Sequence, residues 1–423
     1  QYNLRERFND FGQAFHDVID TAIAEKVNFV LLAGDLFQKR SIDALTLNQA
    51  IVGLERLRAA GIPCIAVEGN HEHAYYDDYI GWMKFLAVRQ LLVLLDPERF
   101  EGGIPQLAAY TRRAGSYIDP LPGVRIHGLR YLGASTGRVL ESYVEALQAL
   151  PRDGVEYSIF LTHAGVEGEL AEQVGGLTMR QLAPLRAHAD YVALGHIHKP
   201  FERDAWVYNP GSLETCSAQE AQWANRGYYL VDVDTSRGEG PKHVARLHAN
   251  RRRTFCSMSL KVDTLLSPDH LYDECRRFLK RKALDQGVAR LGPKERPVVA
   301  LHLNGVLPFD RTALDLARLE ELVRECYDPL HVMVHNHTHS TEYAVEAGET
   351  LSRSVLERQV LAGLFERDTR FRDHSQSWAR AALSLKALAL DGAEPQAVVD
   401  ELEARMAAIE QEGKAADDVD SGR

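Results

Sequence analysis

Four short polar clusters in the first two hundred residues carry the side chains best suited to chemistry. They contribute one aspartate, one asparagine and four histidines: Asp35, Asn70, His71, His163, His196 and His198. Imidazole and carboxylate groups together suit manganese, iron or zinc, and one carboxylate can bridge two ions. No cysteine lies in any of the four clusters, which argues against a structural zinc site built from thiolates. The residue types therefore indicate a divalent-metal centre.

Each cluster follows a short apolar run that predicts a buried strand. The runs are residues 28–33, 62–67, 157–161 and 190–194, and residues 44–60 between the first two have helical periodicity. Alternation of helices with fully apolar strands predicts a layered α/β fold. In an open α/β sheet the carboxyl ends of the strands share one edge, where ligands bind. We therefore expect the four clusters to meet at one edge of a sheet.

The composition excludes several classes of protein. With 49 Lys plus Arg against 60 Asp plus Glu, the net charge is −11, which does not fit a histone-like protein that binds nucleic acid by charge alone. The sequence has neither an apolar run of membrane-spanning length nor a signal-peptide pattern, so we expect no membrane partner. Five scattered cysteines form no disulfide framework, which predicts a reducing, cytoplasmic location.

The 423 residues are enough for two to three domains. Residues 1–250 hold all four clusters, and residues 251–340 have the pattern of a smaller α/β domain. Residues 341–412 carry three apolar stripes at helical spacing, and the polar residues 413–423 predict a disordered tail.

The clusters resemble the signature of the calcineurin-like metallophosphoesterases, which reads Gly-Asp, Gly-Asn-His-(Asp/Glu), His and Gly-His-x-His. Within that superfamily the chain most resembles the SbcD-type DNA repair exonucleases, the nuclease subunits of a double-strand-break repair complex. The segments that carry this likeness are residues 32–37, 65–71, 126–131, 193–199 and 209–214. The resemblance implies a four-layer α/β/β/α nuclease domain, a capping domain, and exonuclease and endonuclease activity on DNA ends.

The resemblance also implies a centre of two Mn²⁺ ions. Asp35 would bridge the two ions. Asn70, His163 and His196 would complete the coordination of one ion, and His198 would bind the other. Two cations so placed can hold the phosphate oxygens and lower the pKa of a bound water.

Other residues would face the substrate rather than the metal. By the same resemblance His71 would orient the scissile phosphate or protonate the leaving oxygen, and a structural hydrogen bond is the alternative role. Lys199, Arg203 and Arg130 lie near the ligand-bearing loops and are candidates for contacts with DNA phosphates.

One feature of the superfamily is absent from the sequence. The superfamily opens with a strand that ends in Asp-x-His and supplies two further ligands to the ion held by His198, and no Asp-x-His occurs here. Because residues 4–8 resemble the segment that follows that motif, we expect the motif to precede Gln1 in a longer chain. The sequence as written is expected to hold one ion well and the other poorly.

The resemblance implies two protein partners besides DNA ends. Residues 341–412 would dock on the coiled-coil base of an SMC-like ATPase, and the nuclease domain would form a homodimer. Two other interpretations stay open at this point. The chain could hydrolyse a small phosphodiester or phosphomonoester, or it could be a catalytically incomplete scaffold that tethers DNA ends.

Overall fold

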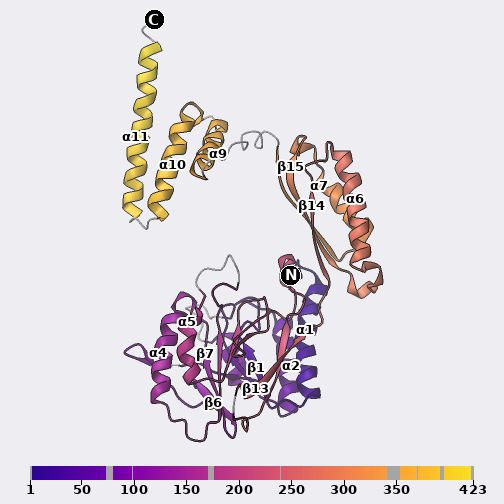
Figure 1. Cartoon of the computed structure of the whole chain (residues 1–423), viewed down its shortest axis with the longest axis vertical. Helices are drawn as coiled ribbons and strands as arrows, with labels where there is room; N and C mark the ends of the chain where they lie inside the picture. The colour runs from indigo at the N-terminus through magenta and orange to yellow at the C-terminus, as the bar shows by residue number, and fades with distance from the viewer. Residues whose placement is uncertain are drawn as a thin grey trace. The chain divides into compact units, whose positions relative to one another are not determined.

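The structure is a computed structural model that describes residues 2–72, 80–97, 99–169, 176–238, 240–340, 353–368, 370–390 and 395–420 (Figure 1). Its internal contacts divide the chain into two compact units. The first comprises residues 1–261, 268–304 and 314–337, and the second comprises residues 262–267, 305–313 and 338–423. The domain boundaries predicted from the sequence stay predictions. Residues 341–352, at the start of the predicted helical region, lie outside the described residues.

Two sheets pack face to face in the first unit. The smaller sheet is parallel and contains β1 (Val30–Ala33), β2 (Cys64–Val67) and β3 (Val93–Leu94). The larger has the order β10-β11-β9-β8-β7-β6, with parallel central strands and antiparallel strands at both edges. Its strands are β6 (Tyr117–Leu121), β7 (Val124–Leu129), β8 (Tyr157–His163), β9 (Tyr191–Gly195), β10 (Phe201–Arg203) and β11 (Val207–Asn209). Ile65 of β2 and Ile159 of β8 belong to one buried apolar cluster between the sheets.

Helices cover the outer face of each sheet. On the smaller sheet, Ile19, Leu54 and Met83 from three helices share an apolar cluster with Ala66 of β2. These helices are α1 (Arg5–Ala24), α2 (Ala44–Ala59) and α3 (Trp82–Val88). On the larger sheet, α4 (Thr136–Ala149) and α5 (Met179–Leu182) pack in the same way against a cluster that includes Phe160 of β8. The order helix, sheet, sheet, helix confirms the predicted four-layer α/β architecture.

Two antiparallel pairs of strands lie outside the two large sheets: β4 (Phe100–Glu101) with β5 (Ile104–Pro105), and β12 (Gly227–Val233) with β13 (His243–Ala249). A further sheet follows later in the chain. It contains β14 (Phe255–Lys261), β15 (Val298–Leu307) and β16 (His331–Ser340), in that order. Helices α6 (Pro268–Asp285) and α7 (Leu316–Tyr327) accompany it (Figure 1). Residues of β14 alternate between buried and exposed, so the sheet has one covered face and one open face.

The second unit contains the three predicted helices. They are α9 (Arg353–Arg367), α10 (Ser375–Leu390) and α11 (Pro395–Asp420). The Trp378 ring of α10 lies 6.2 Å from that of Phe365 in α9. Helix α11 includes residues 413–420, for which the polar composition predicted disorder; alanine and lysine in this stretch favour continuation of the helix. Among the described residues, none of the helices is long and apolar enough to span a membrane.

Candidate metal centre

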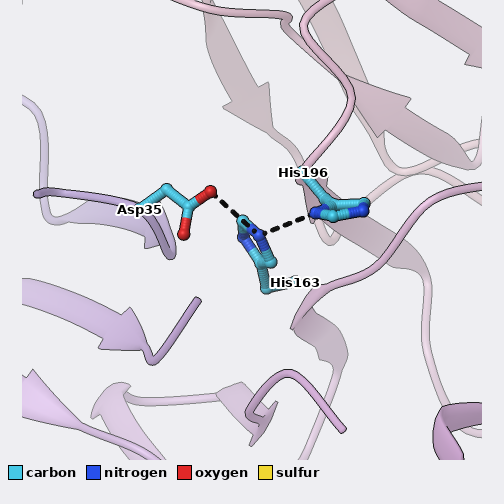
Figure 2. Close-up of side chains that lie close together, drawn as sticks. All are labelled: Asp35, His163 and His196. Carbon is cyan, nitrogen blue, oxygen red and sulfur yellow. Dashed lines mark hydrogen bonds and ion pairs between the residues drawn. The ribbon is translucent and has the colours of Figure 1, made fainter. Parts of the chain in front are cut away.

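Three ligand-type side chains from distant parts of the chain meet at one point of the first unit. Asp35 follows β1, His163 is the last residue of β8, and His196 directly follows β9. His163 Nε2 lies 3.3 Å from Asp35 Oδ2 and 3.2 Å from His196 Nδ1 (Figure 2). One ligand atom from each residue lies within 4.8 Å of the other two, a spacing that suits a single metal ion.

The ligand-bearing strands belong to two sheets, whereas the sequence analysis expected one edge of a single open sheet. Asp35 comes from the smaller sheet, and His163 and His196 come from the larger one. A hydrogen bond joins the sheets at this point, because His163 Nδ1 donates to the carbonyl oxygen of Ala33 at 2.6 Å. Both sheets present the carboxyl ends of parallel strands to the same site, which fits the two-sheet, four-layer fold that the resemblance implies rather than the single sheet edge expected from the strand pattern.

The contacts of His163 bring four ligand-type groups together. A carbonyl oxygen can only accept, so Nδ1 of His163 carries a proton, and its other ring nitrogen, Nε2, faces the remaining groups. Nε2 lies 3.3 Å from Asp35 Oδ2 and 2.9 Å from Asn70 Oδ1. Asn70 Oδ1 is also 2.9 Å from His196 Nδ1. Imidazole, amide and carboxylate groups are ligand types that a divalent ion takes, so the four residues fit such an ion.

The protonation of two of these groups favours metal binding. Burial, together with the neighbouring His163, lowers the pKa of His196 to about 4, so this imidazole is neutral at pH 7. Burial alone would raise the pKa of Asp35, but hydrogen bonding and charge from His163 outweigh that effect and hold it below its ordinary value. A neutral imidazole and an ionised carboxylate are the forms that bind metal.

Two glycines allow the loops to approach this closely. A Cβ atom on Gly69 would lie 2.2 Å from Asp35 Oδ1, and one on Gly34 would lie 2.5 Å from His163 Nδ1. Gly34 also has a φ of +79°, which favours glycine over other residues. Each position therefore requires the absence of a side chain.

Glu72 connects the two loops of the smaller sheet, and the sequence analysis assigned it no role. Its carboxylate accepts hydrogen bonds from the main-chain N–H groups of Asp35 (3.0 Å), Phe37 (2.9 Å) and Gly69 (2.9 Å). Its side chain is almost wholly buried, and this burial raises its pKa above the ordinary value despite the three donors. Its position in the Gly-Asn-His-Glu motif was the sequence feature that could have indicated this role.

His71 lies at the edge of the site, and one of its two ring nitrogens forms a hydrogen bond with the main chain. Its Nδ1 donates to the carbonyl oxygen of Gln38 at 2.6 Å, and its Nε2 lies 3.8 Å from Asp35 Oδ2. The side chain is 42% exposed, so a substrate could reach it. This placement is compatible with a role in proton transfer and does not place His71 among the four converging groups.

The fold and these groups agree with a comparison against known families. Residues 5–200 match the family model described as calcineurin-like phosphoesterase. We refer to residues 5–200 as the phosphoesterase domain, after the family model that they match. This result confirms the resemblance inferred from the four polar clusters, and all four lie within the matched residues.

Relatives of the phosphoesterase domain include several archaeal proteins, each named DNA double-strand break repair protein Mre11. The protein of Saccharolobus solfataricus is 30% identical over 55% of this chain and 56% of its own length. That of Aeropyrum pernix is 26% identical over 66% of this chain and 64% of its own length. The Archaeoglobus fulgidus protein is 28% identical over 52% of this chain and 48% of its own length. The chain thus spans about half to two thirds of these relatives.

His198 of the phosphoesterase domain belongs to a second group of ligand-type residues. Its Nδ1 lies 2.8 Å from Glu220 Oε1, and His198, Cys216 and Glu220 offer ligand atoms within 4.8 Å of one another. Cys216 and Glu220 raise the pKa of His198 to about 10, so its imidazole is protonated in this arrangement. Arg226 also pairs with Glu220 at 3.0 Å. The sequence analysis named neither Cys216 nor Glu220, since neither lies in one of the four clusters.

The three candidate DNA-contact residues form ion pairs within the domain. Lys199 Nζ lies 3.3 Å from the carboxylate of Glu169, which also pairs with Arg203. Arg130 pairs with Asp96. Glu169 is buried, while the charged ends of Lys199 and Arg203 are partly exposed. Their role in DNA binding stays a prediction.

Proposed function

We propose that the chain is a metal-dependent phosphodiesterase that hydrolyses DNA at its ends during double-strand-break repair, as exonuclease and endonuclease. The observation that carries this proposal is the convergence of Asp35, Asn70, His163 and His196 on one point. The relatives, which are named as DNA double-strand break repair proteins, support DNA breaks as the substrate class.

In this proposal the centre uses two Mn²⁺ ions. Asn70, His163 and His196 would hold one ion together with Asp35, and His198 would contribute to the second, which Asp35 would share. When bound, the ions supply positive charge for the phosphate oxygens and lower the pKa of a bound water. The proposal requires His198 to leave its ion pair with Glu220 and to bind the metal ion instead.

The residues of the chain perform the remaining steps. Glu72 fixes the Asp35 loop against the Gly69 loop, which keeps the carboxylate oriented toward His163. His71 orients the scissile phosphate or donates a proton from Nε2 to the leaving oxygen, while Gln38 holds its other nitrogen. Lys199, Arg203 and Arg130 are proposed to bind the DNA backbone through their exposed ends.

Partners are proposed on the same basis. Residues 341–412 would dock on the coiled-coil base of an SMC-like ATPase, and exposed apolar side chains in this range suit such a surface: Val360, Leu364, Val399 and Met406. The phosphoesterase domain would form a homodimer. The five free cysteines support a reducing compartment, and we propose the cytoplasm.

The test measures hydrolysis by the purified full chain with Mn²⁺, using bis-p-nitrophenyl phosphate and linear duplex DNA as substrates. We expect both to be cleaved, and Asp35→Ala to abolish both activities. Cleavage of the small ester without cleavage of DNA ends, even in the presence of an SMC-like ATPase partner, would favour a small-molecule phosphodiesterase. Failure to cleave either substrate, with DNA binding retained, would favour a scaffold.

A further inference from the structure

The open face of the β14-β15-β16 sheet carries a histidine cluster far from the phosphoesterase signature in sequence. His302 lies on β15, and His335 and His337 lie on β16, the neighbouring strand. Residues two apart on a strand share a face, so His335 and His337 project from the same side of the sheet. All three are partly or fully accessible, in contrast to the buried Leu301 and Leu303 that flank His302.

The three imidazole rings are grouped closely and lie nearly parallel. The His302 ring is 4.8 Å from that of His335 and 5.5 Å from that of His337, with interplanar angles of 18° and 9°. The rings of His335 and His337 are 6.0 Å apart. His302 Nδ1 and His337 Nε2 approach to 3.3 Å, so one of these nitrogens must be an acceptor.

The group is well suited to a metal, and His302 within it is unfavourable to protonate. Burial lowers the pKa of His302, and the neighbouring His335 and His337 lower it further, because adjacent imidazolium charges repel. The neutral imidazole is the form that binds transition metals. Two nitrogen ligands of a tetrahedral Zn²⁺ lie about 3.3 Å apart when each bond is 2.0–2.1 Å. The separation of His302 Nδ1 and His337 Nε2 already has this value.

We propose that His302, His335 and His337 form a surface site for a divalent transition metal of the zinc class. His302 and His337 supply the preformed pair, and His335 completes the site by turning its ring from the stacked position toward them. The face also presents hydroxyl groups, since Ser257 and Ser259 lie exposed on β14. The site shares no residue with the Asp35 centre and does not depend on the proposed nuclease activity.

The test compares Zn²⁺ binding by the untagged full chain and by the triple variant His302→Gln, His335→Gln, His337→Gln. Isothermal titration should show one fewer Zn²⁺ per chain for the triple variant, while far-UV circular dichroism stays unchanged. Each single substitution should weaken the binding of that Zn²⁺ ion at least tenfold. The loss of a residue that only hydrogen-bonds a metal ligand already has an effect of this size. His270→Gln on α6 is the matched control and should bind like the wild type.

Equal stoichiometry and affinity in the wild type and the triple variant would overturn the proposal. A His335→Gln variant that binds as tightly as the wild type would overturn the three-ligand site. Because the Asp35 centre also binds cations, the titration is repeated in an Asp35→Ala background. The difference of one ion should persist there even if the nuclease proposal fails, so the two failures are distinguishable.

Discussion

The Glu72 carboxylate accepts a hydrogen bond from the main-chain N–H of Asp35 at 3.0 Å, and this bond spans two loops that are 37 residues apart. The same carboxylate binds the N–H of Gly69. The loop that carries the Asp35 carboxylate and the loop that carries Asn70 are therefore held together by one carboxylate.

Replacement of Glu72 by glutamine should weaken metal binding. The amide has one acceptor oxygen instead of two, so at least one of the three N–H donors loses its partner. We expect a loss of about 1–3 kcal/mol in the free energy of unfolding, and roughly 10–100-fold weaker Mn²⁺ binding. Titration calorimetry and urea unfolding measure the two effects. Unchanged Mn²⁺ affinity would show that Glu72 does not position the ligands.

Substitutions of His71 and Asp35 should separate proton transfer from metal binding. His71→Ala should lower kcat by about 10²–10⁴-fold, with the bound manganese unchanged, because the side chain is not among the converging ligands.

Asp35→Ala should remove both ions, since its carboxylate is proposed to be shared. Metal analysis after dialysis measures the content of each variant. Loss of manganese from His71→Ala would make His71 a ligand, and two ions retained by Asp35→Ala would contradict the bridging role.

Gly69→Ala should disturb the site through sterics alone. The added Cβ would lie 2.2 Å from Asp35 Oδ1 and 2.5 Å from its main-chain nitrogen, so Asp35 or the Gly69 loop must shift. We expect Mn²⁺ binding and hydrolysis to fall together. Gly238→Ala is the matched control, because a Cβ there meets nothing within 4 Å. Equal Mn²⁺ affinity of the two variants would argue against tight packing of the loops.

The charge of Glu169 should limit DNA binding by the phosphoesterase domain. Glu169→Gln removes the anion that pairs with both Lys199 and Arg203. If these cations reach phosphates, each added contact should steepen the dependence of log K on log salt by about 0.9. Filter binding with duplex DNA over a salt series measures the slope. Asp204→Asn, which breaks the exposed pair with Arg186, is the control, and a slope equal to that of the control would rule out these contacts.

His127 should make the fold sensitive to acid. Burial, reinforced by Arg125, lowers the pKa of His127 to about 3 from its ordinary value of 6.5. Between these values the unfolded chain binds a proton that the folded chain does not, so stability falls as the pH falls. Relative to His127→Phe, the wild type should lose up to roughly 3 kcal/mol near pH 4. Urea unfolding of both proteins across this range tests the difference, and parallel curves would contradict it.

The sequence predicts the elements better than their arrangement. The apolar run at residues 62–67 corresponds to β2 (Cys64–Val67), and the periodic segment 44–60 corresponds to α2 (Ala44–Ala59). A buried parallel strand is apolar on both faces, so its pattern is the same in either of two stacked sheets. For this reason the strand pattern could not show that Asp35 and His163 belong to different sheets, and only the family resemblance implied two stacked sheets.

The residues of the candidate site were likewise predictable from the sequence only in part. Asp35, Asn70, His163 and His196 each lie at or just after the end of a strand and could be expected to meet, and the structure brings them together. Their role as ligands stays a prediction. Cys216 and Glu220 reach His198 from residues that carry no strand-end signal, so only the folded chain could reveal that group.

The bond from His163 to the carbonyl oxygen of Ala33 has a thermodynamic consequence. The proposed ligands come from opposite halves of the sandwich and can surround an ion only after those halves have docked, so the proposed coordination and this docking are linked equilibria. Each tenfold excess of free metal over its dissociation constant then adds about 1.4 kcal/mol to the association of the halves. Chelation withdraws that contribution, which makes the melting temperature itself a gauge of metal occupancy.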